Sequence, residues 1–239
     1  MKKIGIVGGM GPESTLYYYR MLIDLCRENK DLVGNRPEII IYSVKGRARS
    51  ESTPLENNKT GGSDGVLSVV QSLYQAGADF GIIACNTAHR FFDDIRAKSP
   101  MPLLSIVEET CNEVDRQGLK KVGLLGSAIT MSSNFYPDVF SKRNITIVVP
   151  KEDEQTYINN KLFSEVVKGI MLDDVRKGFL KIAQRMMAEE SIEGLILGCT
   201  EMPLLINKAD GEELGIPFFD TSRIHVQSAL RYCLSEETQ

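Results

Sequence analysis

Short apolar runs alternate with amphipathic stretches along most of this sequence. Residues 3–7, 80–84 and 102–106 are runs of strand length, and residues 38–44 form the continuous β-branched run that is typical of a strand buried on both faces. A helix is predicted over residues 64–76, because apolar side chains recur there with helical spacing at Val66, Val69, Val70 and Leu73. This alternation predicts an α/β fold with parallel strands and right-handed crossovers.

The pattern then starts again in the second half of the chain. KKVGLLGS at residues 120–127 repeats KKIGIVGG at residues 2–9 almost position by position, and these segments are 118 residues apart. Cys85 in GIIACNT and Cys199 in GLILGCT also match, at a separation of 114 residues. Two nearly equal offsets indicate two homologous lobes. The second half is further predicted to hold strands at 145–149 and 195–197 and helices at 154–168, 173–189 and 224–233.

We therefore predict an α/β fold of two pseudo-symmetric lobes with parallel central sheets and the active site in the cleft between them. Lobe one is expected over residues 1–105 plus 221–239, and lobe two over residues 106–220. The polar, aperiodic segment 46–63 is longer than most connections in compact domains. It is interpreted as a mobile flap beside a ligand site, with simple disorder as the alternative.

Composition and charge exclude several classes of protein. The 42% hydrophobic and 25% charged content is that of an ordinary globular chain, and no apolar run approaches the ~18 residues of a membrane helix. The N-terminal segment lacks the apolar core of a signal peptide. A net charge of -4 gives no electrostatic footprint for nucleic acid. We expect a cytoplasmic protein that binds neither membrane nor nucleic acid.

The five cysteines do not form a metal-binding or disulfide framework. The sequence has no CxxC motif and two histidines, so the spacing of a structural zinc site is absent. An odd number of cysteines without a signal peptide favours reduced thiols. Cys26, Cys111 and Cys233 lie in predicted helical stretches and are interpreted as structural. No metal is expected.

Cys85 and Cys199 follow strands, where a parallel sheet presents its ligand-binding edge. Each is expected at the N-terminus of the next helix, which lowers a thiol pKa from about 8.5 and offers free amides to an anion. If the two lobes face each other, one thiolate could remove the proton of a substrate carbon and the opposite thiol could return one. That chemistry is a two-base racemisation. Neighbouring groups suited to an α-carboxylate are Asn86, Thr87, Ser127, Thr130 and Thr200, with Gly8–Gly11 allowing close backbone approach.

IGIVGGMGPEST, CNTAH and GCTE together resemble the aspartate/glutamate racemase superfamily, and most of all its aspartate racemase branch. SIVEET at 105–110, EDEQ at 152–155 and FFDTS at 218–222 extend the likeness over essentially the whole chain. The resemblance implies a homodimeric enzyme that acts on a small acidic amino acid without pyridoxal phosphate or any other cofactor. It implies Cys85 and Cys199 as the acid/base pair. The substrate contacts that it implies are Met10, Asn86, Thr87, Ser127, Thr130 and Thr200.

The sequence departs from the aspartate racemase pattern where the substrate's side-chain carboxylate would be held. That pattern has an arginine on the flap, for which Arg47 and Arg49 are both candidates here, and a lysine just before a glycine. Val167 stands at the expected lysine position and Lys168 follows it. All three cations are also interpreted as solvated surface charges. The resemblance implies aspartate as the substrate, and because of these departures glutamate is kept as the alternative.

Simpler interpretations exist for each motif. A cysteine at a strand end can be a small buried residue, but two in matching frames beside threonine favour chemistry. GGMGPES matches the dinucleotide-binding GxGxxG motif poorly, and the second strand lacks the acid that binds ribose. His89 could tune Cys85, orient the substrate or be exposed in the first turn of a helix. Glu201 could adjust Cys199 or simply favour the positive end of its helix.

Three alternative functions remain open from the sequence alone. A maleate isomerase-like or a decarboxylase-like member of the superfamily would use the same scaffold, although two retained cysteines favour a racemase over a single-cysteine decarboxylase. A non-catalytic dicarboxylate or amino-acid binding protein is the third.

Overall fold

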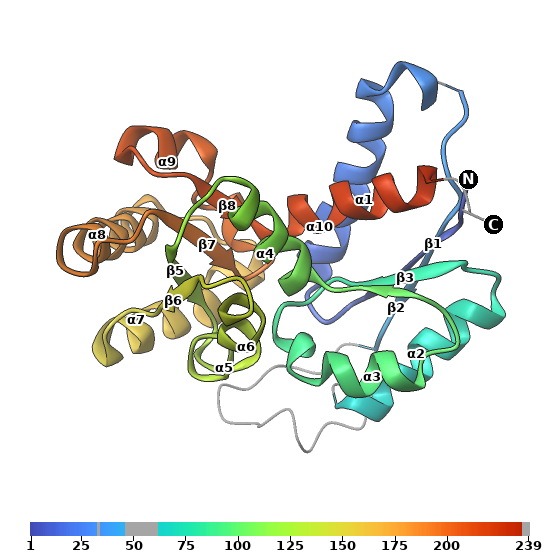
Figure 1. Cartoon of the computed structure of the whole chain (residues 1–239), viewed down its shortest axis with the longest axis horizontal. Helices are drawn as coiled ribbons and strands as arrows, with labels where there is room; N and C mark the ends of the chain where they lie inside the picture. The colour runs from blue at the N-terminus through green and yellow to red at the C-terminus, as the bar shows by residue number, and fades with distance from the viewer. Residues whose placement is uncertain (33, 46–61, 236–239) are drawn as a thin grey trace. The chain divides into compact units, whose positions relative to one another are not determined.

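The computed structural model describes residues 1–32, 34–45 and 62–235. Within these residues the strands form two four-stranded parallel sheets, which confirms the predicted α/β fold with parallel central sheets (Figure 1). The chain divides into two compact units: unit 1 is Met1–Ile106 with Ser222–Gln239, and unit 2 is Val107–Thr221. The predicted flap at 46–63 lies almost wholly outside the described residues, and so do Arg47 and Arg49.

Unit 1 is built around the sheet β2-β1-β3-β4. Its elements are β1 (Ile4–Gly8), α1 (Pro12–Glu28), the 3-10 helix η1 (Lys30–Leu32), β2 (Ile39–Ser43), α2 (Ser63–Gln75), β3 (Phe80–Ile83), the 3-10 helix η3 (Thr87–Phe91), α3 (Phe92–Lys98), β4 (Leu103–Leu104) and α10 (Thr221–Leu234).

Unit 2 is built around the sheet β6-β5-β7-β8. Its elements are α4 (Ile106–Arg116), β5 (Lys121–Gly126), α5 (Ala128–Ser132), α6 (Phe135–Ser141), β6 (Thr146–Val148), α7 (Glu152–Ser164), the 3-10 helix η4 (Val166–Lys168), α8 (Asp173–Glu190), β7 (Gly194–Gly198), the 3-10 helix η5 (Met202–Leu204), α9 (Lys208–Leu214) and β8 (Phe218–Asp220).

The two sheets have the same topology. In each, the first strand of the unit is flanked by the second and the third, and the fourth lies beyond the third. β1 therefore corresponds to β5, and β3 corresponds to β7. The internal repeat that the sequence predicted is thus present at the level of strand order.

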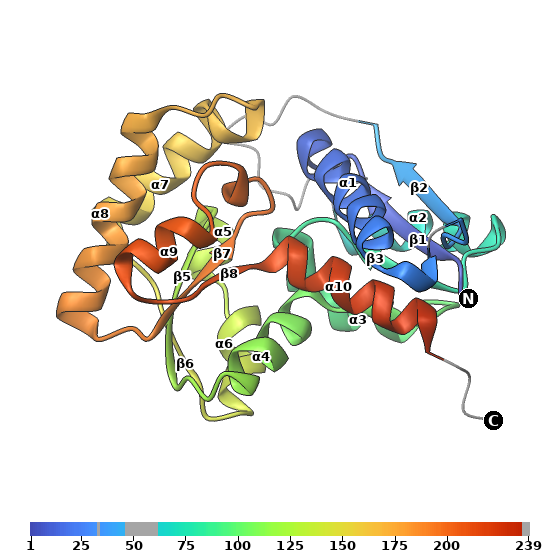
Figure 2. The same cartoon turned by 90° about the horizontal axis from the view of Figure 1, so that it is seen from above.

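The sheet of unit 1 is covered on both faces. Ile4 and Ile6 on β1 point to the face where α1 and α10 pack, and Val7 points to the face of α2 and α3, because side chains alternate along a strand (Figures 1 and 2). The C-terminal helix α10 belongs to this core through Val226, Ala229, Leu230 and Cys233. Helices thus cover both faces of the sheet, and the turns that follow the strands lie at the carboxyl ends of the strands.

One strand differs from its prediction. The run 38–44 was expected to be buried on both faces, but Ile39 and Ile40 are half-buried and Ile41, Tyr42 and Ser43 are exposed. The physical reason is that β2 is the edge strand of its sheet and pairs with β1 alone. The expectation of a doubly buried strand is therefore wrong.

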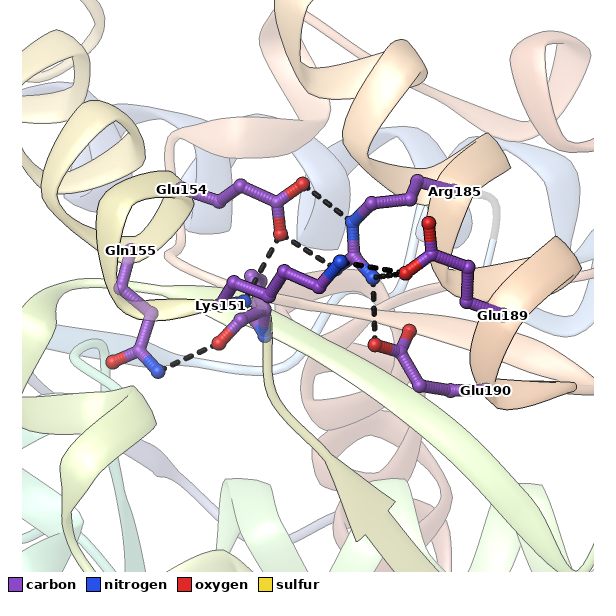
Figure 3. Close-up of polar contacts among 7 residues, drawn as sticks. Lys151, Glu154, Gln155, Arg185, Glu189 and Glu190 are labelled. Carbon is purple, nitrogen blue, oxygen red and sulfur yellow. Dashed lines mark hydrogen bonds and ion pairs between the residues drawn. The ribbon is translucent and has the colours of Figure 1, made fainter.

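In unit 2, α7 and α8 pack against one face of the sheet, and hydrogen bonds and ion pairs connect the two helices. Arg185 on α8 makes two hydrogen bonds to the carboxylate of Glu154 at the start of α7 and also pairs with Glu189 and Glu190 (Figure 3). Lys151, just before α7, pairs with Glu189. A bidentate arginine–carboxylate pair fixes direction as well as distance. The arrangement of α7 on α8 is therefore specified by both apolar and charged contacts.

Candidate active site

The strand order creates a topological switch point in each unit. The chain leaves β1 toward β2 on one side and leaves β3 toward β4 on the other, and β5 and β7 repeat this arrangement. Val7 is paired with Ile83, and Gly126 with Gly198, so the carboxyl ends of the two strands lie side by side. Open parallel sheets bind ligands at such points. The candidate site residues fall on the turns that follow these strands.

In unit 1 the turns after β1 and β3 are fixed by hydrogen bonds. The Ala84 amide donates to the Val7 carbonyl at 3.0 Å and the Cys85 amide to Ile83 at 2.8 Å. Cys85 is 8% exposed and belongs to an apolar cluster against which Met10 packs. Asn86 is buried and Thr87 half-buried, directly after the cysteine. Met10, Asn86 and Thr87 are thus on the two turns of the same switch point as Cys85.

His89 is hydrogen-bonded to the backbone of the turn that carries Cys85. Its Nδ1 lies 2.8 Å from the carbonyl of Cys85, and the Ile106 amide donates to its Nε2 at 3.2 Å. A backbone amide can only donate, so Nε2 is unprotonated, Nδ1 carries the hydrogen and the ring is neutral. His89 is 3% exposed, so of the alternatives considered for it, a solvent-exposed first-turn histidine is wrong. It contacts the Cys85 backbone and positions the turn.

A second neutral histidine lies beside the first. His225 on α10 is fully buried, its Nε2 donates to the Leu104 carbonyl at 3.0 Å, and its Nδ1 accepts from the Tyr18 hydroxyl at 3.1 Å. The rings of His89 and His225 have centroids 5.9 Å apart. Burial lowers the pKa of His89 to about 4, and burial together with His89 lowers the pKa of His225 to about 3.

These two imidazoles are expected to make the protein less stable in mild acid. In the unfolded chain they titrate near pH 6.5, so between that pH and the folded pKa values the unfolded chain binds protons that the folded chain does not. The free energy of unfolding therefore falls as the pH drops below about 6.5, by about 2 kcal/mol for each histidine at pH 5. The measurement is the urea midpoint at pH 7.5 and pH 5.0.

Three carboxylates with lowered pKa values affect the free energy of unfolding only below the range between pH 7.5 and pH 5.0. The pKa values of Asp173, Glu189 and Glu193 are lowered by their hydrogen-bond donors, so their contribution is lost only as the pH falls below the unfolded values of 3.8 for the aspartate and 4.5 for the glutamates. His225→Gln serves as the control and should show a smaller fall between the two pH values. Equal midpoints at both pH values in the unmodified protein would contradict neutral buried histidines.

In unit 2 the corresponding turns carry Ser127 and Cys199. The Ser127 side chain caps α5 by accepting from the Thr130 amide at 3.3 Å, and the two hydroxyl oxygens lie 3.0 Å apart. Cys199 is half-buried and directly follows β7. Its Sγ lies 3.2 Å from Oε2 of Glu201, and the Thr200 hydroxyl donates to the same oxygen at 2.9 Å. The three candidate hydroxyls and the thiol thus share one switch point.

The helices that directly follow the two cysteines are short 3-10 helices. Cys85 precedes the five-residue 3-10 helix η3, and Cys199 precedes the three-residue η5. The expected stabilisation of a thiolate by a helix N-terminus therefore has little support at Cys199, because a macrodipole needs several aligned peptide units. Glu201 is 3% exposed and bonds to the thiol, so it does more than favour a helix end.

The three other cysteines have the environments of structural residues, as predicted. Cys26, Cys111 and Cys233 are buried on α1, α4 and α10. Burial raises the pKa of each thiol, to about 11 for Cys111. All five cysteines lie within the described residues and are free thiols.

Arg90 is a residue that the sequence analysis missed. Its Nε and Nη2 are buried without a hydrogen-bond partner, and its guanidinium carbon lies 4.4 Å from the centroid of Phe91. Nε and Nη2 form one edge of the guanidinium, which matches the two oxygens of a carboxylate. Side chains three residues apart eclipse on a 3-10 helix, so Arg90 lies on the face of η3 that carries Thr87. The only sequence signal was a cation one turn after CNT.

Lys168 is exposed at the end of η4 in unit 2. The described part of the chain holds no group of three or more His, Cys, Asp or Glu side chains arranged for a metal ion. Every helix within the described ranges is too short or too polar to cross a lipid bilayer.

Comparisons with known proteins show which family and fold the chain resembles. A model of the Asp/Glu/Hydantoin racemase family matches residues 7–229. The chain is 26% identical over 239 residues to the broad specificity amino-acid racemase RacX of Bacillus subtilis (strain 168), covering 98% of this chain and 100% of RacX. The solved structure of an aspartate racemase homologue from Pyrococcus horikoshii OT3 is 33% identical with a TM-score of 0.82, covering 98% and 100% of the two chains. An aspartate racemase from Picrophilus torridus, 23% identical with a TM-score of 0.75 and coverage of 97% and 94%, shares the fold.

Proposed function

The chain belongs to the Asp/Glu/hydantoin racemase family and is an amino-acid racemase; from this premise we propose that it interconverts L- and D-aspartate by a two-cysteine, two-base mechanism. The observation that carries the mechanism is the equivalence of the two cysteines. Each follows the third strand of its unit, beside the turn after the first strand, and each has a threonine within two residues. A two-base reaction at one carbon needs two such groups, one for each face of the carbon.

The proposed steps conserve protons and charge. One thiolate takes the α-proton, and the electron pair of the broken C–H bond is delocalised into the α-carboxylate. The opposite thiol then donates its proton to the other face of the carbon, so the enzyme ends with the thiol and thiolate exchanged. Backbone amides and hydroxyls directed at the developing charge stabilise the intermediate. We propose Asn86, Thr87, Ser127, Thr130 and Thr200 for this role, with Met10 packing beside the substrate, and no cofactor in any step.

We propose Arg90 as the group that binds the substrate's side-chain carboxylate. Support comes from its buried, unpaired Nε–Nη2 edge, because a charged N–H group without an acceptor is costly in a protein interior. Thr87, on the same face of η3, would contact the α-carboxylate end. Arg47, Arg49 and Lys168 remain candidates for the same carboxylate. The aspartate racemase homologue from Pyrococcus horikoshii OT3 supports an acidic substrate, while RacX supports a broader range.

The test is proton NMR of the purified, reduced protein with L-aspartate in D2O and no added cofactor. The expected result is loss of the α-proton signal together with formation of D-aspartate. L-Glutamate and L-alanine run in parallel, and Arg90→Lys should lower the preference for aspartate over alanine because it removes the forked donor. Absence of exchange with every amino acid would contradict the proposal and direct the search to dicarboxylates, the substrates of an isomerase. Ligand-induced thermal stabilisation without turnover would instead indicate a binding protein. The homodimer and the cytoplasmic location stay predictions.

A further inference from the structure

We propose that Glu201 keeps Cys199 protonated in the resting enzyme, so that Cys199 starts the cycle as the acid and Cys85 as the base. This inference rests on the proposed two-cysteine function. It assigns Glu201 as a positioning residue that acts through Cys199, and it makes the two halves of the reaction chemically unequal.

The contacts of Glu201 carry the inference. The carboxylate is 3% exposed, and its Oε2 accepts from Cys199 Sγ at 3.2 Å and from the Thr200 hydroxyl at 2.9 Å. The Thr200 hydroxyl is a neutral donor, and the ion pairs found among the described residues include none between Glu201 and a lysine, arginine or histidine. A buried carboxylate without a cationic partner needs hydrogen bonds from the neutral groups around it.

The proton of this pair resides on sulfur. An unperturbed carboxyl group ionises near pH 4.3 and a thiol near pH 8.5, so one shared proton favours the thiol and the carboxylate. Ionising Cys199 would also place a second negative charge 3.2 Å from the first and remove the hydrogen bond. Both effects hold Cys199 in the thiol form.

Cys85 has no matching carboxylate. Within the described residues no acidic side chain is hydrogen-bonded to its sulfur, and the nearby His89 is neutral and contacts the backbone carbonyl. The two cysteines follow equivalent strands, yet an anion adjoins one and a neutral ring adjoins the other. The resting distribution of the single thiol proton is therefore biased toward Cys199.

The bias predicts unequal kinetics for the two enantiomers. The enantiomer whose α-proton faces Cys85 binds to an enzyme in which Cys85 is already the base and Cys199 already the acid. Its product leaves a thiolate on Cys199, and solvent must carry the proton from Cys85 back to Cys199 before the next turnover. Because enantiomers have equal free energy, kcat/KM must be the same in both directions. The bias therefore changes kcat and KM together, by the same factor.

The first test needs no substrate. The pH dependence of iodoacetamide alkylation is measured separately at Cys85 and Cys199 by peptide mass spectrometry. In the unmodified protein the midpoint for Cys199 is expected above that for Cys85. Glu201→Gln, which keeps an oxygen acceptor but removes the charge, should lower the Cys199 midpoint by at least one pH unit, a tenfold change in thiolate fraction. Glu212→Gln, on an exposed side chain, is the matched control and should leave both midpoints unchanged.

An unchanged or raised Cys199 midpoint in Glu201→Gln would overturn the inference, and a raised one would mean that Glu201 activates the thiol. Glu201→Asp keeps the charge and should stay close to the unmodified protein, which keeps the test decisive if Glu201→Gln does not fold. Because alkylation is independent of turnover, this result stands even if the racemase proposal fails. Where racemisation is measured, Glu201→Gln should bring the two kcat values closer together while kcat/KM stays equal in both directions.

Discussion

Cys85→Ser and Cys199→Ser are each expected to reduce racemisation of aspartate by at least about 10³-fold in both directions. A hydroxyl is a far weaker acid than a thiol and cannot supply the base, and positioned acid–base groups contribute roughly 10²–10⁴-fold to catalysis. Serine is nearly isosteric, so binding of substrate should be largely retained. The measurement is chiral chromatography of product formed from L- and D-aspartate, with ligand-induced thermal shift as the readout of binding.

Isotope exchange separates the roles of the two thiols. Each single variant keeps one competent cysteine, so in D2O it is expected to exchange the α-proton of one enantiomer without inverting it. The two variants should exchange opposite enantiomers. Cys26→Ala is the control, because this cysteine is buried on α1 away from either switch point and should leave kcat unchanged. Full activity in Cys85→Ser would refute the two-base mechanism.

Gly9→Ala is expected to lower the free energy of unfolding by about 3 kcal/mol or more. Gly9 has φ +83°, where a residue with a Cβ pays about 1–2 kcal/mol. An added Cβ would also lie 2.6 Å from both the nitrogen and the oxygen of Val44, which are backbone atoms that cannot rotate away. Overpacking of this kind costs about 1–3 kcal/mol in addition. Urea unfolding followed by circular dichroism measures the change.

Gly77→Ala provides the matched control. Gly77 has φ +93° but an added Cβ would meet nothing within 4 Å, so this variant bears the conformational cost alone. The difference between the two variants isolates the clash with Val44. A Gly9→Ala protein as stable as Gly77→Ala would show that the turn after β1 can move away from β2, contrary to the hydrogen bond from the Val44 amide to the Gly8 carbonyl at 3.0 Å.

The repeat and the position of both cysteines could be predicted from the sequence because they depend on patterns that are visible in the sequence itself. Short apolar runs ending in glycine occur twice at similar spacing, and parallel strands place their carboxyl ends together. The structure confirms two parallel sheets and gives them one strand order. Helices α7, α8 and α10 were also predicted within a few residues.

Features that depend on neighbours distant in the sequence were not predictable. The exposure of β2 follows from its place at a sheet edge, which an apolar run does not reveal. Buried His89 accepts a hydrogen bond from the amide of Ile106, 17 residues further along the chain, and the contact of Glu201 with Cys199 depends on a tight turn before η5. α9 and β8 were missed because both are short and carry little periodicity.

The shared strand order of the two units bears on how an enzyme can serve a reaction whose reactant and product are mirror images. The free energies of reactant and product are equal in such a reaction, and the simplest protein for it contains the same structural unit twice. Doubling an ancestral unit would provide the second part without inventing it. Once doubled, each copy could change alone, and here one cysteine turn carries a carboxylate while the other is held by an imidazole. The duplication thus supplies a matched pair, and the differences between its halves are where a preference for one hand of the substrate can arise.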